Sequence, residues 1–97
     1  MTSIEYLRFS IVNEMQEEFI RAIKGARVIL SAYPACLNNE ISHCQENDSL
    51  FIWRIEWEST DAHMNGFRKS TEFMPFFKIM EPFVNSVIEM NHYSKLD

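Results

Sequence analysis

One segment constrains the fold more than any other: residues 50–57 read LFIWRIEW. Successive side chains of an extended strand point to opposite faces. One face of this segment therefore carries only large apolar side chains, which are Phe51, Trp53, Ile55 and Trp57. The other face mixes aliphatic with charged side chains. The pattern predicts a strand that buries one face in a core and presents a second face too apolar to be plain solvent-facing surface.

The remaining sequence predicts partners for this strand. Segments rich in β-branched and aromatic residues predict strands at 3–12, 36–44 and 85–96. Residues 13–33 predict a helix, because Met15, Phe19, Ile23, Ala26 and Leu30 recur on one helical face. A second helix is expected after an N-cap at Ser59, interrupted near Pro75 and ending at Pro82.

The resulting order is β-α-β-β-α-β, the ferredoxin-like arrangement. We therefore expect one α+β domain over residues 1–97, with an antiparallel sheet and both helices on one of its faces. The predicted inward face comprises Leu7, Phe9, Ile11, Leu37, Ile41, His43, Phe51, Trp53, Ile55, Trp57, Ile88, Met90 and His92. The predicted opposite face comprises Tyr6, Arg8, Ser10, Ile52, Arg54, Glu56, Val87, Glu89, Asn91 and Tyr93.

The opposite face carries too many apolar side chains for a surface exposed to water and too many charges for a hydrophobic core. These features fit a homodimer that packs this face on a second copy, with its charges paired across or around the interface. The residues expected to carry that contact are Tyr6, Arg8, Arg54, Glu56, Glu89 and Tyr93.

Composition narrows the class of protein. The net charge of −5 argues against nucleic-acid binding. The sequence has no apolar run of membrane-spanning length and no signal-peptide core, so a cytoplasmic protein without membrane contact is expected. The two cysteines, Cys36 and Cys44, are expected to be free thiols.

His63 is the leading candidate for chemistry. It falls near the start of the second helix and shares a predicted inward face with Phe67, Ser70, Met74 and Phe77. The positive end of the helix disfavours the imidazolium, so a neutral imidazole able to accept a proton is expected. The alternative is a hydrogen-bonded packing residue without a catalytic role.

Two further patterns bear on a ligand site. Trp53 and Trp57 share one strand face and form either ordinary core or an aromatic wall for a flat ligand. His43, His92 and the cysteines lack the spacing of zinc ligands, so no metal is predicted. Both glycines are isolated, which argues against a nucleotide cofactor.

The segments FIWRIEWESTDAHMNGFRKSTEFMPFF and PFVNSVIEMNHY resemble the antibiotic biosynthesis monooxygenase (ABM) family of the dimeric α/β-barrel superfamily. The matching positions are Trp57, Ser59, Ala62, His63, Phe67, Arg68, Ser70, Phe73, Phe77, Pro82, Phe83, His92 and Tyr93. The resemblance covers essentially the whole chain and implies the same fold and a homodimer built from facing sheets.

The family includes cofactor-independent oxygenases of quinol-type or polycyclic aromatics, haem degraders, and proteins without an established activity. The resemblance implies that His63 removes a phenolic proton and that no cofactor is needed. We expect the substrate to contact Trp53, Trp57, Phe67, Phe77, Phe9 and His43. Haem degradation is disfavoured, because Pro75, Phe76 and Phe77 occupy the region of the haem-ligating histidine. The alternative function is a non-catalytic, homodimeric binding module for a small hydrophobic ligand.

Overall fold

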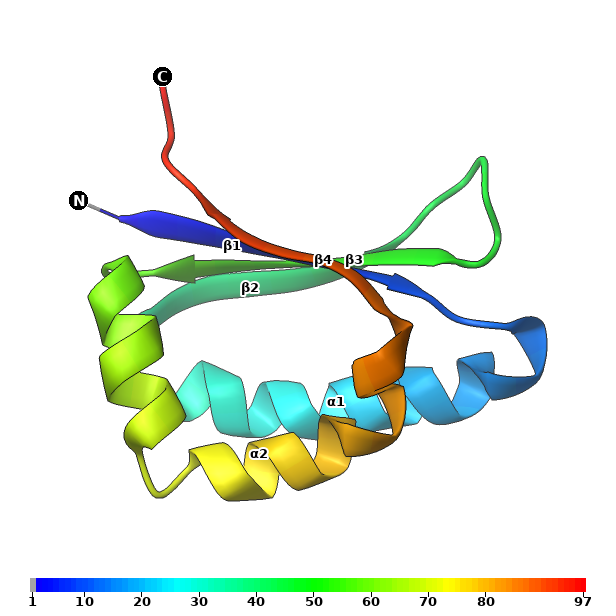
Figure 1. The fold of residues 1–97 in the computed structure, drawn as a ribbon, viewed down its shortest axis with the longest axis horizontal. Coiled ribbons are helices and arrows are strands. Elements are labelled where there is room, and N and C mark those ends of the chain that lie inside the picture. The colour runs from blue at the N-terminus through cyan, green and yellow to red at the C-terminus, as the bar shows by residue number, and fades with distance from the viewer. Residues whose placement is uncertain (1) are drawn as a thin grey trace.

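The computed structural model describes residues 2–97. Four strands form one sheet in the order β2-β3-β1-β4, and every neighbouring pair is antiparallel. The strands are β1 (Ser3–Ser10), β2 (Cys36–His43), β3 (Leu50–Trp57) and β4 (Val87–Tyr93). The helices α1 (Gln16–Ala32) and α2 (Phe73–Met80) both lie on one face of this sheet (Figure 1). The predicted ferredoxin-like α+β fold is therefore confirmed.

The core lies between the sheet and α1. Phe19, Ile23, Ala26 and Leu30 of α1 are all buried, as their helical spacing predicts, whereas Met15 is only partly buried. The ring of Phe19 packs 4.9 Å from the rings of Phe9 and Phe51. All four apolar residues on the inward face of β3 are at most 4 % exposed, so this strand is the centre of the core.

The second helical region is broken into pieces. The hydroxyl of Ser59 accepts the Ala62 N–H at 3.0 Å, as an N-cap does. A π-helical turn, η2 (Ala62–Gly66), and a 3₁₀ turn, η3 (Phe67–Lys69), follow, and η2 and η3 stand against one end of the sheet (Figure 1). The chain then turns into α2. Pro75 lies in the first turn of α2, where its missing N–H breaks no helical hydrogen bond. The interruption is thus just before Pro75.

Two irregularities correct the predicted facing of the edge strands. The register of β2 shifts between Cys36 and Asn38, so Leu37 is 49 % exposed and Asn39 is buried instead. The register between β1 and β4 shifts after Arg8, so Phe9 lies opposite Val87. An extra residue in one strand reverses the alternation of side chains beyond it. The expectations that Leu37 and Ile88 face inward and that Val87 faces outward were therefore wrong.

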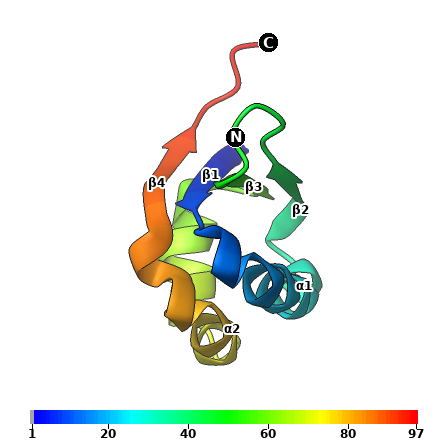
Figure 2. The ribbon, with the colours of Figure 1, turned by 90° about the vertical axis from the view of Figure 1, so that its right-hand side faces the viewer.

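No helix of residues 2–97 covers the second face of the sheet (Figure 2). Its charged residues pair within the chain: Arg8 Nε lies 2.5 Å from Glu89 Oε1, and Arg54 lies 3.9 Å from Glu56. The rings of Tyr6 and Tyr93 pack in a T-shaped arrangement, with their centroids 5.1 Å apart. We call this surface the bare face.

Within residues 2–97, no helix combines the length and the hydropathy needed to cross a membrane. Cys36 and Cys44 are both free thiols.

Candidate active site

A cavity of about 290 Å³ lies between the sheet and the second helical region. Its size is at the lower end of the range for small-molecule sites, roughly 300–1,000 Å³. Strands β1, β3 and β4, together with η2 to α2, supply most of its wall. The lining residues are Glu5, Leu7, Phe9, Leu30, Trp53, Ile55, Trp57, His63, Phe67, Arg68, Phe73, Phe76, Phe77, Met80, Val84, Val87 and Met90. Most of them are apolar or aromatic, which suits a flat, apolar ligand.

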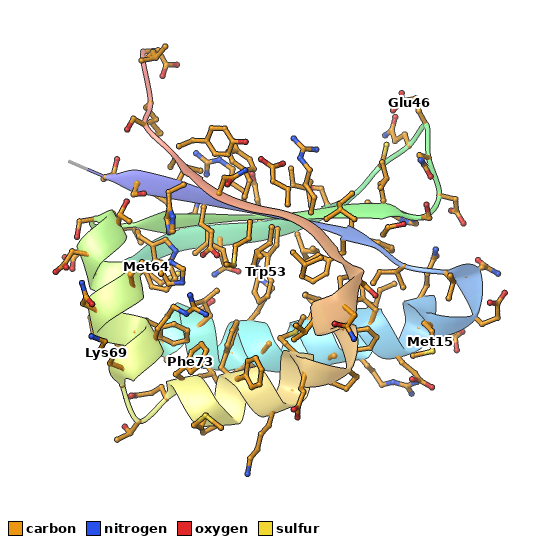
Figure 3. The ribbon with its side chains drawn as sticks, in the orientation of Figure 1. Met15, Glu46, Trp53, Met64, Lys69 and Phe73 are labelled. Carbon is orange, nitrogen blue, oxygen red and sulfur yellow. The ribbon has the colours of Figure 1, made fainter. Side chains whose placement is uncertain are left out.

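Trp53 points from the sheet toward the helices, into the middle of the molecule (Figure 3). Its indole N–H donates to Asn39 Oδ1 at 3.2 Å. Asn39 is fixed in turn by Arg27, whose Nε donates to the same oxygen at 2.6 Å, and it donates to Ser31 Oγ at 2.9 Å. Because a buried indole N–H needs an acceptor, this network satisfies Trp53 and leaves its ring to form the wall.

Glu5 is the acceptor for the other tryptophan. The Trp57 indole N–H donates to Glu5 Oε1 at 3.0 Å, and the Glu5 residue is only 2 % exposed. Burial raises the pKa of this carboxyl to about 7, although the Trp57 hydrogen bond and the Arg68 guanidinium both lower it. Desolvation disfavours the charged form, so a carboxyl with one donor takes up a proton near neutral pH.

His63 lies between Glu5 and His92. Its ring stacks on the Trp57 ring at 4.5 Å with an angle of 12°. Nε2 of His63 is 3.6 Å from Glu5 Oε1, and Nδ1 makes a 2.8 Å hydrogen bond with His92 Nε2. We call Glu5, His63 and His92 the polar cluster. Its members come from β1, η2 and β4, three separate parts of the chain.

The surroundings keep His63 uncharged. Burial, together with the neighbouring His92 and the Arg68 guanidinium, lowers the pKa of His63 to about 3. Burial and Arg68 also lower the pKa of His92. The neutral imidazole expected from the sequence is therefore present, but an imidazole with so low a pKa is by itself a weak proton acceptor.

The polar cluster is the one group of potential metal ligands of this kind within residues 2–97. One ligand atom from each of Glu5, His63 and His92 lies within 4.8 Å of the others. His63, however, faces Glu5 through Nε2 and His92 through Nδ1. A metal ion in this group would take one nitrogen of His63, whereas both nitrogens face a side-chain partner in this structure. The geometry is a chain of three groups, in which the middle one uses both of its nitrogens.

The structure brings together most of the residues predicted for the site. The cavity wall includes His63, Trp53, Trp57, Phe67, Phe77 and Phe9. Their contact with a substrate stays a prediction. Phe67 is 1 % exposed, and its ring packs between those of Trp57 and Phe73. Met74, assigned to the same inward helical face, is 53 % exposed, because the turn before α2 resets the helical phase.

His43 does not lie at this cavity, contrary to the sequence expectation. It is in the edge strand β2, where it stacks on Phe51 at 4.0 Å, and its Nε2 lies 2.7 Å from the Asp48 carbonyl oxygen. Its inward facing was predicted from alternation alone. β2 is an edge strand that packs against α1, whereas the strands that line the cavity are β3, β1 and β4.

Glu5 and Arg68 are the polar lining residues that the sequence expectations did not assign to the site. Glu5 lies on the same strand face as Leu7 and Phe9. A charged residue on a face that is otherwise predicted to be buried could have indicated a functional role for Glu5. His92 was placed correctly on the inward side of β4, opposite Glu5. Its hydrogen bond to His63 could not be read from the sequence, since the two residues are 29 positions apart.

Residues 3–78 match the family described as antibiotic biosynthesis monooxygenase. The chain belongs to the ABM family. This match includes β1 to β3 and most of the second helical region, and so it contains Glu5 and His63.

Relatives of the ABM chain are distant in sequence and close in fold. It is 25 % identical over 79 residues to the uncharacterized protein YczJ of Bacillus subtilis (strain 168), covering 81 % of this chain and 83 % of YczJ. A conserved protein from Methanosarcina mazei Go1 superposes with a TM-score of 0.82 at 18 % identity, over 98 % of this chain and 93 % of that one. SnoaB, a cofactor-independent oxygenase from Streptomyces nogalater, superposes with a TM-score of 0.77 at 12 % identity, over 99 % and 94 %. These structural likenesses establish the fold.

Proposed function

We propose that this protein is a cofactor-independent monooxygenase of a small electron-rich aromatic of the quinol or polycyclic phenol type. The observation that carries the proposal is an aromatic-walled cavity with a buried carboxyl and imidazole at one place in its wall. Membership of the ABM family and the fold shared with SnoaB are compatible with it.

The proposed reaction requires few functional groups of the protein. The substrate loses its hydroxyl proton, and the resulting anion reduces dioxygen; anthrone reacts as its enol tautomer, which carries a phenolic O–H. One oxygen atom becomes a carbonyl on the ring and the other leaves as water. The two hydrogens of that water come from the hydroxyl group and from the ring carbon that is oxidised, so that anthrone and dioxygen give anthraquinone and water. The protein must bind a flat molecule, accept a proton and exclude water. The apolar wall and the polar cluster supply these three functions.

Oxygen consumption with anthrone tests the proposal. We expect the parent protein to consume dioxygen in proportion to the anthraquinone formed, without added metal or organic cofactor. The variant His63→Ala should lose this activity while retaining its circular dichroism spectrum. If His63→Ala with a native spectrum turns over anthrone as fast as the parent, His63 has no part in catalysis.

The second candidate is a non-catalytic binding module for a small hydrophobic ligand. The observation that favours it is the low pKa of His63, which suits a hydrogen-bonding residue better than a lone base. This function predicts that a hydrophobic aromatic quenches the fluorescence of Trp53 and Trp57 saturably, with no oxygen consumed. Turnover of anthrone by the parent would exclude a purely binding role.

The proposed assembly is a homodimer through the bare face. Tyr93 is 44 % exposed there, and the Arg8–Glu89 and Arg54–Glu56 pairs neutralise charge within one chain. A face with exposed aromatic rings and paired charges is typical of a subunit interface. Light scattering should give twice the chain mass for the parent and a lower mass for Arg8→Glu. A parent of single-chain mass in dilute solution would contradict the dimer.

The cytoplasmic location also stays a prediction.

A further inference from the structure

His63 alone does not account for the removal of a phenolic proton. A base for a phenolic proton must reach the substrate and must hold the proton near the working pH. His63 borders the cavity, but its pKa of about 3 makes it a poor holder of a proton. Glu5 also borders the cavity and is the only carboxylate among the lining residues that the structure describes.

We infer that Glu5 is the catalytic base of the proposed reaction and that His63 and His92 form a proton relay from Glu5 to the edge of the sheet. The inference rests on the proposed function and assigns its proton transfer to named atoms. The geometry that supports it is the order of the three groups. Glu5 and His92 contact opposite nitrogens of His63, so the imidazole can accept on one side while it donates on the other.

One arrangement of protons satisfies this order. His63 Nδ1–H donates to His92 Nε2 across 2.8 Å, which leaves His63 Nε2 as an acceptor that faces Glu5. The separation of 3.6 Å between His63 Nε2 and Glu5 Oε1 exceeds a hydrogen bond, so proton transfer between them requires the two atoms to approach each other. The Trp57 N–H donates to the same Glu5 oxygen.

The proton path balances over a full turnover. The substrate O–H bond breaks, its electron pair stays on the substrate oxygen, and a new O–H bond forms at Glu5. Glu5 passes the proton to His63 Nε2, His63 passes its Nδ1 proton to His92, and His92 releases its Nδ1 proton to water. When the second oxygen atom of dioxygen leaves as water, the relay runs in reverse, which returns a proton and restores both imidazole tautomers.

The position of His92 suits the outer end of this relay. His92 is half-buried in β4, and β4 is an edge strand of the sheet. The other titratable or charged groups that face the cluster are Arg68 from η3 and Cys36 from β2. Arg68 favours an anion in the cavity, and the pKa of the Cys36 thiol is raised by burial, so neither group competes for the proton.

The first experiment needs no turnover. Carboxyl ¹³C and imidazole ¹⁵N resonances are followed by NMR from pH 4 to 9, and Glu5→Gln identifies the Glu5 signal. We expect Glu5 to titrate near pH 7 and His63 to carry its proton on Nδ1. A Glu5 midpoint near the ordinary value of 4.5, or a proton on His63 Nε2, overturns the relay. Stoichiometric shifts of both His63 and His92 on addition of Zn²⁺ or Fe²⁺ alone would assign the cluster to a metal ion instead and would also overturn it.

The second experiment uses anthrone. Glu5→Gln keeps an acceptor for Trp57 and should lower kcat/KM by ~10²–10⁴-fold, the usual contribution of a general base. For the parent, kcat/KM should rise with pH to a plateau above about 7. His92→Gln should make the rate depend on buffer concentration, because buffer then replaces the relay, whereas a purely structural loss would not. His43→Gln, at a histidine outside the cavity, is the matched control and should match the parent.

The two proposals fail separately. If the parent turns over anthrone and Glu5→Gln does so equally well, the relay is wrong and the monooxygenase stands. If the parent does not turn over anthrone, the proposed oxygenation of that substrate class is wrong, and the NMR experiment decides whether Glu5 and His63 are arranged as a relay.

Discussion

Each face of the sheet carries a glutamate, and the pKa values of these two glutamates are shifted in opposite directions. Glu5 lies on the helix-covered face, where burial raises its pKa to about 7. Glu89 lies on the bare face, where hydrogen bonds from Tyr93, Asn91 and Arg8 lower its pKa to about 2. The two strands that carry them, β1 and β4, are neighbours. The same type of side chain therefore has a raised pKa on one face and a lowered pKa on the other.

The difference comes from the balance of burial and donors. Glu5 is buried and receives one hydrogen bond, from Trp57. Glu89 receives donors from Tyr93, from Asn91 at 3.0 Å and from Arg8 at 2.5 Å. Each donor stabilises the charged form, whereas loss of water destabilises it. Burial thus outweighs the single donor on the covered face, and the three donors outweigh burial on the bare face.

The largest expected effect is on the stability of the covered face. Trp57→Ala removes a side chain that is 1 % exposed, its hydrogen bond to Glu5 and its stacking on His63. We expect the free energy of unfolding to fall by ~3–5 kcal/mol, as for other buried aromatic residues. Urea denaturation measures this loss. Trp57→Phe should lose less, and a loss below ~1 kcal/mol for the alanine variant would mean that this end of the cavity is not well packed.

The Glu5 carboxyl should make the stability of the protein depend on pH. The folded state keeps this proton up to about pH 7, whereas the unfolded state releases it near 4.5. The free energy of unfolding should therefore fall by ~3 kcal/mol as the pH rises between these values. Glu5→Gln should remove this fall. Denaturation of both proteins at pH 4 and pH 8 tests it; equal pH dependence in parent and variant would contradict a raised pKa.

The Glu89 carboxyl should act in the opposite sense. Its folded pKa of about 2 lies below the ordinary 4.5. Its contribution to stability is present above pH 4.5 and is lost as the pH falls toward 2. Glu89→Gln should weaken this acid-induced loss, by less than the effect at Glu5 because water screens the bare face. Thermal unfolding between pH 2 and 5 measures it. An unchanged acid slope would mean that Glu89 pairs equally well in the unfolded chain.

The smallest effect is expected at Met74. Its side chain is 53 % exposed, although periodicity predicts an inward position. Met74→Gln should change the free energy of unfolding by no more than ~0.5 kcal/mol, the usual range for surface substitutions. The same denaturation assay applies, and a loss of 2 kcal/mol or more would show that Met74 is covered in the assembled protein.

Local patterns in the sequence are enough to predict the architecture. Strict alternation in β3, helical spacing in α1 and the Ser59 cap are local patterns, and each one limits what its own segment can form. Because these segments follow one another in β-α-β-β-α-β order, few ways of pairing the strands remain. The same alternation and spacing predicted that Trp53, Trp57 and Phe67 face inward, either as ordinary core or as the wall of a ligand site.

The composition of the candidate site depends on the tertiary structure. Register shifts at Cys36 and after Arg8 moved Leu37, Val87 and Ile88 to faces that alternation did not predict. Only the strand order could separate His43 from the cavity. The polar cluster brings together residues that are far apart in the sequence: Glu5 and His92 are separated by 87 positions. The pKa of Glu5 depends on the water that this packing removes. No local pattern contains that information, because desolvation is a property of everything that surrounds a group.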